Sequence, residues 1–168
     1  MACVSYYRER GHAVTALFVD YGQRARSMEL KAARVISRRL GVPLKIVRLT
    51  APDVPLDSSR GRNALLLVVA LAAFDWNAGM IALGIHAGTA YPDCSPAFVK
   101  HVQRLYDTYG FGRVRLDAPF VAWTKRDVYD FALQQDLPLQ FTYSCLRGRS
   151  RPCGACESCK DVEALRVS

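Results

Sequence analysis

Val14-Thr-Ala-Leu-Phe-Val19 is a short apolar run of residues that favour strands, and the turn Asp20-Tyr-Gly22 ends it. An amphipathic helix is predicted next, because Ser27 can cap a stretch of apolar residues at helical spacing that Gly41 ends. The apolar stripe of this helix comprises Met28, Ala32, Val35, Ile36 and Leu40. Residues 44–49 predict a second strand, so this part of the chain indicates a parallel βαβ unit.

The same alternation continues along the chain. Residues 63–76 predict a helix that is apolar on nearly every side and therefore buried, and residues 80–85 predict a strand. A helix from Ser95 and Pro96 to about Tyr109, a strand at 113–116 and a helix from Thr124 to Leu133 follow. We therefore expect an α/β fold, with a mostly parallel open sheet and helices on both faces. Ligands of such sheets bind at the carboxyl ends of the strands.

Four cysteines gather near the C-terminal end: Cys145, Cys153, Cys156 and Cys159. Two overlapping Cys-x-x-Cys turns and one thiolate from a short loop supply the four tetrahedral ligands of a zinc ion. A closed set of four thiolates leaves no position for water or substrate, so we expect the zinc to be structural. Two disulfides are the alternative, but the isolated Cys3 and Cys94 and the lack of a secretory signal favour a metal. An iron–sulfur cluster is the other metal alternative.

The overall composition is that of one globular domain with a small metal knuckle. The chain has 168 residues, 51% of them apolar, which excludes a disordered chain. The longest apolar run is too short to cross a bilayer and no signal peptide is recognisable, so we expect a cytoplasmic protein without membrane contact. The formal charge of +8 favours an anionic ligand such as a nucleotide. Nucleic acid is disfavoured, because the basic helix at 31–39 carries no interleaved aromatic residues.

Two loops at the predicted strand ends could bind a nucleotide. In the first, Gly22 lets the backbone approach a ligand and Tyr21 offers a stacking surface, although a tight turn without a ligand explains the same residues. In the second, Arg62 and Asn63 stand at the head of the apolar helix, where free N–H groups attract an anion. A cap made by Asn63 beside a solvated Arg62 is the alternative there.

Two more loops carry polar groups at the same edge. The loop from Gly84 to Cys94 contains Tyr91, Pro92 and Asp93, and the Asp93 carboxylate can accept hydrogen bonds from an amidine-like base edge; a solvated aspartate is the alternative. Cys94 has no paired histidine, which favours a packed thiol over a nucleophile. Lys125 lies in the first turn of a helix, where a cation opposes the helix dipole, so it indicates a bound anion.

Taken in order, these segments resemble the motifs of one family, 7-cyano-7-deazaguanine synthase, a zinc-containing member of the PP-loop ATP pyrophosphatase superfamily. The resemblance extends from about Val4 to Cys159, and it rests on residues 18–24, 61–63 and 91–94, on Lys125 and on the four cysteines. It implies that ATP activates first the acid and then the amide of 7-carboxy-7-deazaguanine, that ammonia supplies the nitrogen, and that the nitrile product feeds queuosine-type biosynthesis.

The resemblance also implies roles for individual residues. Lys125 and Arg62 would act on the ATP phosphates, together with magnesium, as the catalytic residues. The nucleotide would be bound by Asp20, Tyr21, Gly22, Arg62 and Asn63, and the deazaguanine by Tyr91, Pro92 and Asp93. The zinc knuckle would hold the C-terminal segment beside the active site without taking part in the chemistry. The sequence leaves a homodimer open.

The chain differs from this family at its front. Members begin with a strand that leads into Ser-Gly-Gly-x-Asp-Ser, which wraps the pyrophosphate, and the 168 residues contain no such run. We therefore expect Met1 to be an internal methionine, residues 1–142 to form an N-terminally shortened α/β domain, residues 143–168 to form the knuckle, and this form to be inactive. The loop from Thr50 to Gly61 is also short for the family. A non-catalytic deazaguanine-binding paralogue and a zinc-ribbon nucleic-acid-binding protein are the alternative functions.

Overall fold

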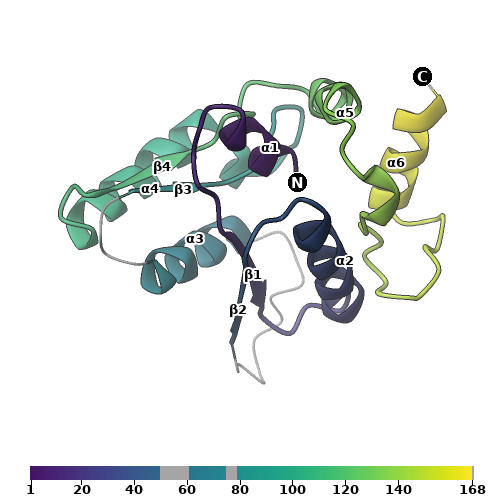
Figure 1. The fold of residues 1–168 in the computed structure, drawn as a ribbon, viewed down its shortest axis with the longest axis horizontal. Helices are drawn as coiled ribbons and strands as arrows, with labels where there is room; N and C mark the ends of the chain where they lie inside the picture. Colours follow the sequence, from purple (N-terminus) through teal and green to yellow (C-terminus); the bar gives the residue numbers. More distant parts are fainter. Residues whose placement is uncertain (50–60, 75–78, 168) are drawn as a thin grey trace.

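The computed structural model describes residues 1–49, 61–74 and 79–167, and it shows helices arranged around two pairs of parallel strands (Figure 1). The strands are β1 (Ala16–Asp20), β2 (Leu44–Arg48), β3 (Gly79–Ala82) and β4 (Val114–Asp117). The helices are α1 (Ala2–Arg8), α2 (Arg26–Arg39), α3 (Arg62–Ala73), α4 (Pro96–Tyr109), α5 (Lys125–Gln134) and α6 (Glu157–Val167). Two 3-10 turns, η1 (Pro92–Cys94) and η2 (Leu139–Phe141), lie in the connections. No helix in these ranges has the length and apolarity needed to cross a membrane.

The predicted strands and helices are confirmed with ends that differ by a few residues, but one predicted cap is wrong. Ser27 lies inside α2 and makes no cap, because the helix already begins at Arg26. A backbone turn starts this helix instead: the Arg26 amide donates to the Gln23 carbonyl at 3.0 Å and the Met28 amide to the Ala25 carbonyl at 3.0 Å. Gly41 follows the helix in a left-handed conformation, with φ of 61°, as a terminating glycine does.

The α/β class with parallel strands is confirmed, and the strands form two separate pairs. β1 pairs with β2 in register from Ala16 opposite Leu44, and β3 pairs with β4 from Gly79 opposite Val114. Among the described residues no ladder joins one pair to the other, since no described strand lies between them. Helix α3 contacts both β1 and β3, so it is an element that links the two pairs.

The main core lies where β3 and β4 pack against α3 and α4. Tyr106 is fully buried at its centre, and its hydroxyl donates to the Leu67 backbone carbonyl at 2.8 Å. This bond satisfies the one polar group of a large buried side chain. The buried core cluster comprises Leu67, Leu71, Ile81, Val102, Tyr106, Val114 and Leu116.

Helix α3 is less buried than its composition predicts. Leu67 and Leu71 face the core, whereas Val68 is 47% exposed. The prediction of a helix buried on every side is therefore wrong, because the described elements cover mainly one face of it. The predicted end of this helix at Trp76 lies outside the described residues, as does the loop at 50–60.

The region of β1, β2 and α2 is more open than the main core. Val19 is the one buried residue of β1, and every residue of β2 is at least partly exposed. The predicted apolar stripe of α2 is only half-buried. A cavity of about 320 Å³ lies against this stripe, lined also by Met1 and Val4 and by Thr142 and Tyr143 of the C-terminal segment. The contrast between the two strand pairs therefore lies in how completely each is covered.

Candidate functional site

The four predicted cysteines meet at one point. Their Sγ atoms all lie within 4.8 Å of one another, with Cys145 buried and the other three half-buried. Four zinc–sulfur bonds of about 2.3 Å place sulfur atoms about 3.8 Å apart in a tetrahedron, so this cluster is close to the size of a metal site. The donor set can hold one metal ion such as zinc, and the four ligands come from a loop and from the start of α6.

Backbone amides favour the thiolate form of two of these cysteines. The Cys153 N–H donates to the Cys145 Sγ at 3.4 Å, and this bond holds the pKa of Cys145 at about 6. A bond from the Leu146 backbone likewise lowers the pKa of Cys156. Cys159 shares a hydrogen bond with Cys156, which raises the pKa of Cys159 to about 11. Thiolates are the form that binds metal, so these backbone bonds favour metal binding at Cys145 and Cys156.

The knuckle is docked on the loop that follows β1. Gly148 has a φ of 63°, and a Cβ there would clash with the Arg24 carbonyl oxygen and lie 3.0 Å from the Cα of Ala25. Nearby, the Tyr143 hydroxyl donates to the Arg149 carbonyl at 2.7 Å. The glycine therefore allows a backbone-to-backbone approach between the cysteine loop and the end of β1.

The loop after β1 is a compact turn held by its own side chains. Asp20 Oδ1 accepts from the Gly22 amide at 3.1 Å, and Gly22 has a φ of 85°. Gln23 is buried, and its amide group donates to the Val19 carbonyl at 3.2 Å and to Glu29 at 3.0 Å. The Tyr21 amide donates back to the Gln23 side chain at 3.0 Å. These bonds fix the turn, and its two roles predicted from sequence, a nucleotide contact and a plain turn, are both compatible with this geometry.

Asn63 and Asp93 form a buried pair at the head of α3. Asp93 is 9% exposed, and its Oδ2 accepts from the Asn63 amide at 3.1 Å, while the Asn63 side chain donates to the Asp93 carbonyl at 3.1 Å. The alternative in which Asn63 caps the helix is therefore wrong, because Gly61 is the N-cap residue and the nearby capping carboxylate comes from Asp93. The solvated alternative for Asp93 is also wrong. Arg62 is exposed, and Tyr91 is 43% exposed.

Lys125 borders a second cavity, of about 410 Å³, at the carboxyl end of β3. Its lining includes Met1, Ala82, Gly84, His86, Lys125 and Leu165. The Lys125 Nζ donates to Asp161 of α6 at 2.5 Å, and both side chains are about half-exposed. His86 Nδ1 lies 2.7 Å from the Ala87 carbonyl, so this ring is engaged with its own loop. A cation at the first turn of a helix beside a cavity is an arrangement that suits an anionic ligand.

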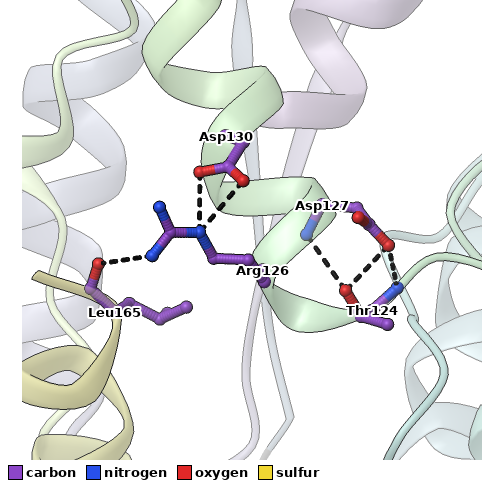
Figure 2. A network of polar contacts seen from close by, with 5 residues as sticks. All are labelled: Thr124, Arg126, Asp127, Asp130 and Leu165. Atoms are coloured by element: carbon purple, nitrogen blue, oxygen red, sulfur yellow. Dashed lines mark hydrogen bonds and ion pairs between the residues drawn. The ribbon is translucent and has the colours of Figure 1, made fainter. Parts of the chain in front are cut away.

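A capping box holds the start of α5, the helix whose first residue is Lys125. Thr124 and Asp127 form the predicted capping box, in which the Thr124 hydroxyl accepts from the Asp127 amide at 3.1 Å and Asp127 accepts from the Thr124 amide at 2.7 Å (Figure 2). The bonds from Thr124 lower the pKa of Asp127. The backbone that carries Lys125 is therefore well defined.

The predicted site residues fall into three groups. Asp20 to Gly22 lie in the turn after β1, Asn63 and Asp93 pair at the head of α3, and Lys125 stands at the 410 Å³ cavity. No described contact joins Arg62 to Lys125. Asp161 was missed by sequence reasoning, because it lies 36 residues from Lys125 and carries no local motif.

Comparison with known proteins places these features in a family. The family of queuosine biosynthesis protein QueC matches residues 1–59 and 51–164. The 7-cyano-7-deazaguanine synthase of Pseudoalteromonas translucida (strain TAC 125) is 32% identical over 187 residues, covering 95% of this chain and 85% of that protein. The synthases of Prochlorococcus marinus (strain MIT 9515) and Brucella suis biovar 1 (strain 1330) are 33% and 32% identical, covering 88% of this chain and 79% and 76% of those proteins.

One difference from these relatives is visible in the alignments. The 187 aligned positions exceed the 168 residues of the chain, so the Pseudoalteromonas relative carries residues within the aligned region that this chain lacks. The two stretches of the family match overlap at residues 51–59, in the loop that was expected to be short.

With matches that span nearly its whole length, the chain belongs to the QueC family of queuosine biosynthesis proteins.

Proposed function

We propose that this chain is an ATP-dependent ligase that converts 7-carboxy-7-deazaguanine and ammonia into 7-cyano-7-deazaguanine. The observation that carries the proposal is its identity of about 32% to proteins named 7-cyano-7-deazaguanine synthase, over most of both chains. Two features support the proposal: a four-cysteine cluster that can hold a metal ion, and a cavity bordered by the Lys125 cation, which suits an anionic ligand. The product would enter queuosine-type biosynthesis, with zinc as the structural metal.

The chemistry consists of two activations by ATP. In the first, the carboxylate of the substrate attacks the α-phosphorus, pyrophosphate leaves, and ammonia displaces AMP from the acyl adenylate to give the amide. In the second, the amide oxygen is adenylated in the same way, and loss of AMP with two protons leaves the nitrile. Charge builds up on the phosphates in both steps, so positioned cations and magnesium would supply most of the catalysis. Lys125 and Arg62 are the cations that we assign to the phosphates.

The remaining roles follow the three groups of residues. Asp20, Tyr21 and Gly22, with Asn63, would hold the nucleotide, since their turn lies at the carboxyl end of β1. Tyr91, Pro92 and Asp93 would hold the deazaguanine. Oδ2 of Asp93 accepts from Asn63, and no hydrogen bond among the described residues uses Oδ1, which leaves an acceptor for a guanine-like N–H edge.

The pyrophosphate of ATP needs more hydrogen-bond donors than Lys125 and Arg62 supply. The 168 residues contain no Ser-Gly-Gly-x-Asp-Ser run, and two side-chain cations cannot replace a wrap of backbone N–H donors around a pyrophosphate. We propose that turnover needs such a loop in addition to these residues. A second candidate function is a non-catalytic protein that binds a deazaguanine; substrate binding without ATP turnover, even when such a loop is supplied, would identify it.

Calorimetry with 7-carboxy-7-deazaguanine tests the substrate assignment. The variant Asp93→Asn keeps an oxygen that can cap α3, because asparagine is as good a cap as aspartate, but it loses the charged acceptor. We expect substrate affinity to fall by about 2 kcal/mol, roughly thirtyfold, the cost of leaving a charged hydrogen-bond partner unpaired.

The control is thermal unfolding of the same variant without ligand, which should stay within about 1 kcal/mol of the parent chain. Equal affinity in both proteins would remove Asp93 from the site. No binding to the parent would reject the proposed substrate.

A further inference from the structure

Helix α6 is anchored at its first turn by the cysteine cluster. Cys156 directly precedes the helix and Cys159 lies within its first turn. The amides of Cys159 and Lys160 both donate to the Cys156 carbonyl at 3.0 Å, so the helix starts on a ligand residue. A metal that fixes the Cys156 and Cys159 sulfurs therefore fixes the origin and direction of α6.

The same helix touches the start of α5 at two points. Asp161 binds the Lys125 Nζ at 2.5 Å, and one turn later the Leu165 carbonyl accepts from the Arg126 Nη1 at 3.4 Å (Figure 2 shows the second contact). Asp161 and Leu165 are four residues apart and so lie on one face of α6. Arg126 is itself held by Asp130 at 2.9 Å on its own helix. Figure 1 shows α6 beside α5 at the C-terminal end of the molecule.

These contacts reach the cavity at the end of β3. Lys125 and Leu165 both line it, so α6 supplies part of its wall and also holds its cation. The backbone of Lys125 is fixed by the capping box, but its side chain has four rotatable bonds and is 42% exposed. The orientation of the ammonium group therefore depends on the partner that it finds on α6.

We propose that Asp161 is a positioning residue, through which the metal-held helix α6 fixes the Lys125 ammonium at the edge of the cavity. An ammonium group has three N–H donors, so the bond to Asp161 leaves two for phosphate oxygens. The role of Lys125 toward phosphate rests on the proposed function; the link from the cysteine cluster to Lys125 does not. The knuckle thereby acts on the site without supplying a ligand to the substrate.

Lysine labelling tests this link without any nucleotide. The zinc-loaded chain is treated briefly with an acetylating reagent, and acetylation of each lysine is measured by peptide mass spectrometry. In the parent, Lys125 should react more slowly than in Asp161→Asn, by about two- to fivefold, the range expected for an exposed ion pair. The matched control is Glu163→Gln on the same helix, since Glu163 is exposed and makes no hydrogen bond or ion pair among the described residues; it should label like the parent.

Removal of the metal should give the same result as loss of Asp161. Chelation of zinc from the parent should raise labelling of Lys125 to the level of Asp161→Asn, while Lys100 of α4 stays unchanged. In Asp161→Asn, chelation should add nothing further at Lys125. An equal rate in parent, variant and chelated protein would overturn the proposal, and so would a further rise after chelation of the variant, because the metal would then act by another route.

A second measurement separates this inference from the proposed function. In protein that turns over ATP, Asp161→Asn should raise the KM for ATP about two- to fivefold and leave kcat nearly unchanged, whereas Glu163→Gln should change neither. A parent joined to the phosphate loop that neither binds nor turns over ATP would reject the proposed function and leave the labelling result standing. ATP turnover with an unchanged KM in Asp161→Asn would reject the positioning role.

Discussion

The two strand pairs have similar local sequences and very different surroundings. The β3–β4 half, taken as β3, β4, α3 and α4, contains a buried cluster of seven side chains, among them the fully buried Tyr106. The β1–β2 half, taken as β1, β2 and α2, has a half-buried helix stripe and a cavity of about 320 Å³. Short parallel strand pairs thus give a closed core in one half and an open one in the other.

The difference shows that the partners of a strand, and not only its own residues, set its burial. Each strand of the β3–β4 half has helices from its own neighbourhood against it, and α4 contacts β4 directly. The β1–β2 half is covered partly by segments that are distant in the sequence, because Met1, Thr142 and Tyr143 all border its cavity. The C-terminal segment that carries the knuckle therefore contributes to the stability of the N-terminal strands.

Loss of a metal ligand should have the largest effect on stability, and it should show the difference between the two halves most clearly. Cys156→Ala removes one of four ligands, and structural zinc sites in peptides bind with apparent free energies of about 10–16 kcal/mol, more than any single core deletion costs. We expect zinc content to fall well below one per chain and amide hydrogen exchange to rise in α2, β1 and α6. Protection in α4 and β4 should persist. Uniform loss of protection in both halves would contradict the comparison.

Matched deletions inside the two halves should differ by a smaller amount. Leu67→Ala removes a side chain that is 2% exposed in the β3–β4 core and should destabilise the chain by about 3 kcal/mol. Ile36→Ala in α2 removes a half-buried side chain that already borders a cavity, so we expect a loss of about 1 kcal/mol. Urea unfolding of both variants measures the difference. Equal losses would mean that the β1–β2 half is as closely packed as the other.

The docking of the knuckle on the β1–β2 half can be tested at a single glycine. Gly148→Ala forces a Cβ against the backbone of Arg24 and also strains a φ of 63°, so it should cost about 2–3 kcal/mol. Gly154→Ala is the control, because Gly154 has a φ of 70° but nothing within 4 Å of its added Cβ; it should cost about 1 kcal/mol. Thermal unfolding at fixed zinc concentration gives both values. A larger loss of stability in Gly154→Ala than in Gly148→Ala would contradict the close contact between Gly148 and the Arg24 backbone.

Features that depend on neighbouring residues could be predicted from the sequence. The cysteine cluster followed from ligand spacing, and the capping box from Thr124 and Asp127, because both are set by local geometry. The strand and helix alternation followed from apolar periodicity for the same reason. The family resemblance added the assignment that the comparisons then confirmed.

Features that depend on tertiary contacts could not be predicted. Asp93 is 30 residues from the amide that it caps, and its pattern in the sequence is that of a solvated loop residue. The pairing of Asp161 with Lys125 and the approach of Gly148 to Arg24 likewise join segments with no shared motif. The apolar pattern alone also does not predict that the strands separate into two pairs, since each strand fits a continuous sheet equally well.

Product formation shows whether these residues form the substrate and metal part of a nitrile-forming ligase. The chain is assayed with 7-carboxy-7-deazaguanine, ammonia, ATP and magnesium, alone and after a strand and Ser-Gly-Gly-x-Asp-Ser loop from a relative are joined ahead of Met1. Mass spectrometry should detect 7-cyano-7-deazaguanine, with release of pyrophosphate and AMP, from the extended protein and none from the 168 residues alone. A folded, zinc-loaded extended protein that makes no nitrile would contradict the proposed function, and turnover by the 168 residues would contradict the need for an added phosphate loop.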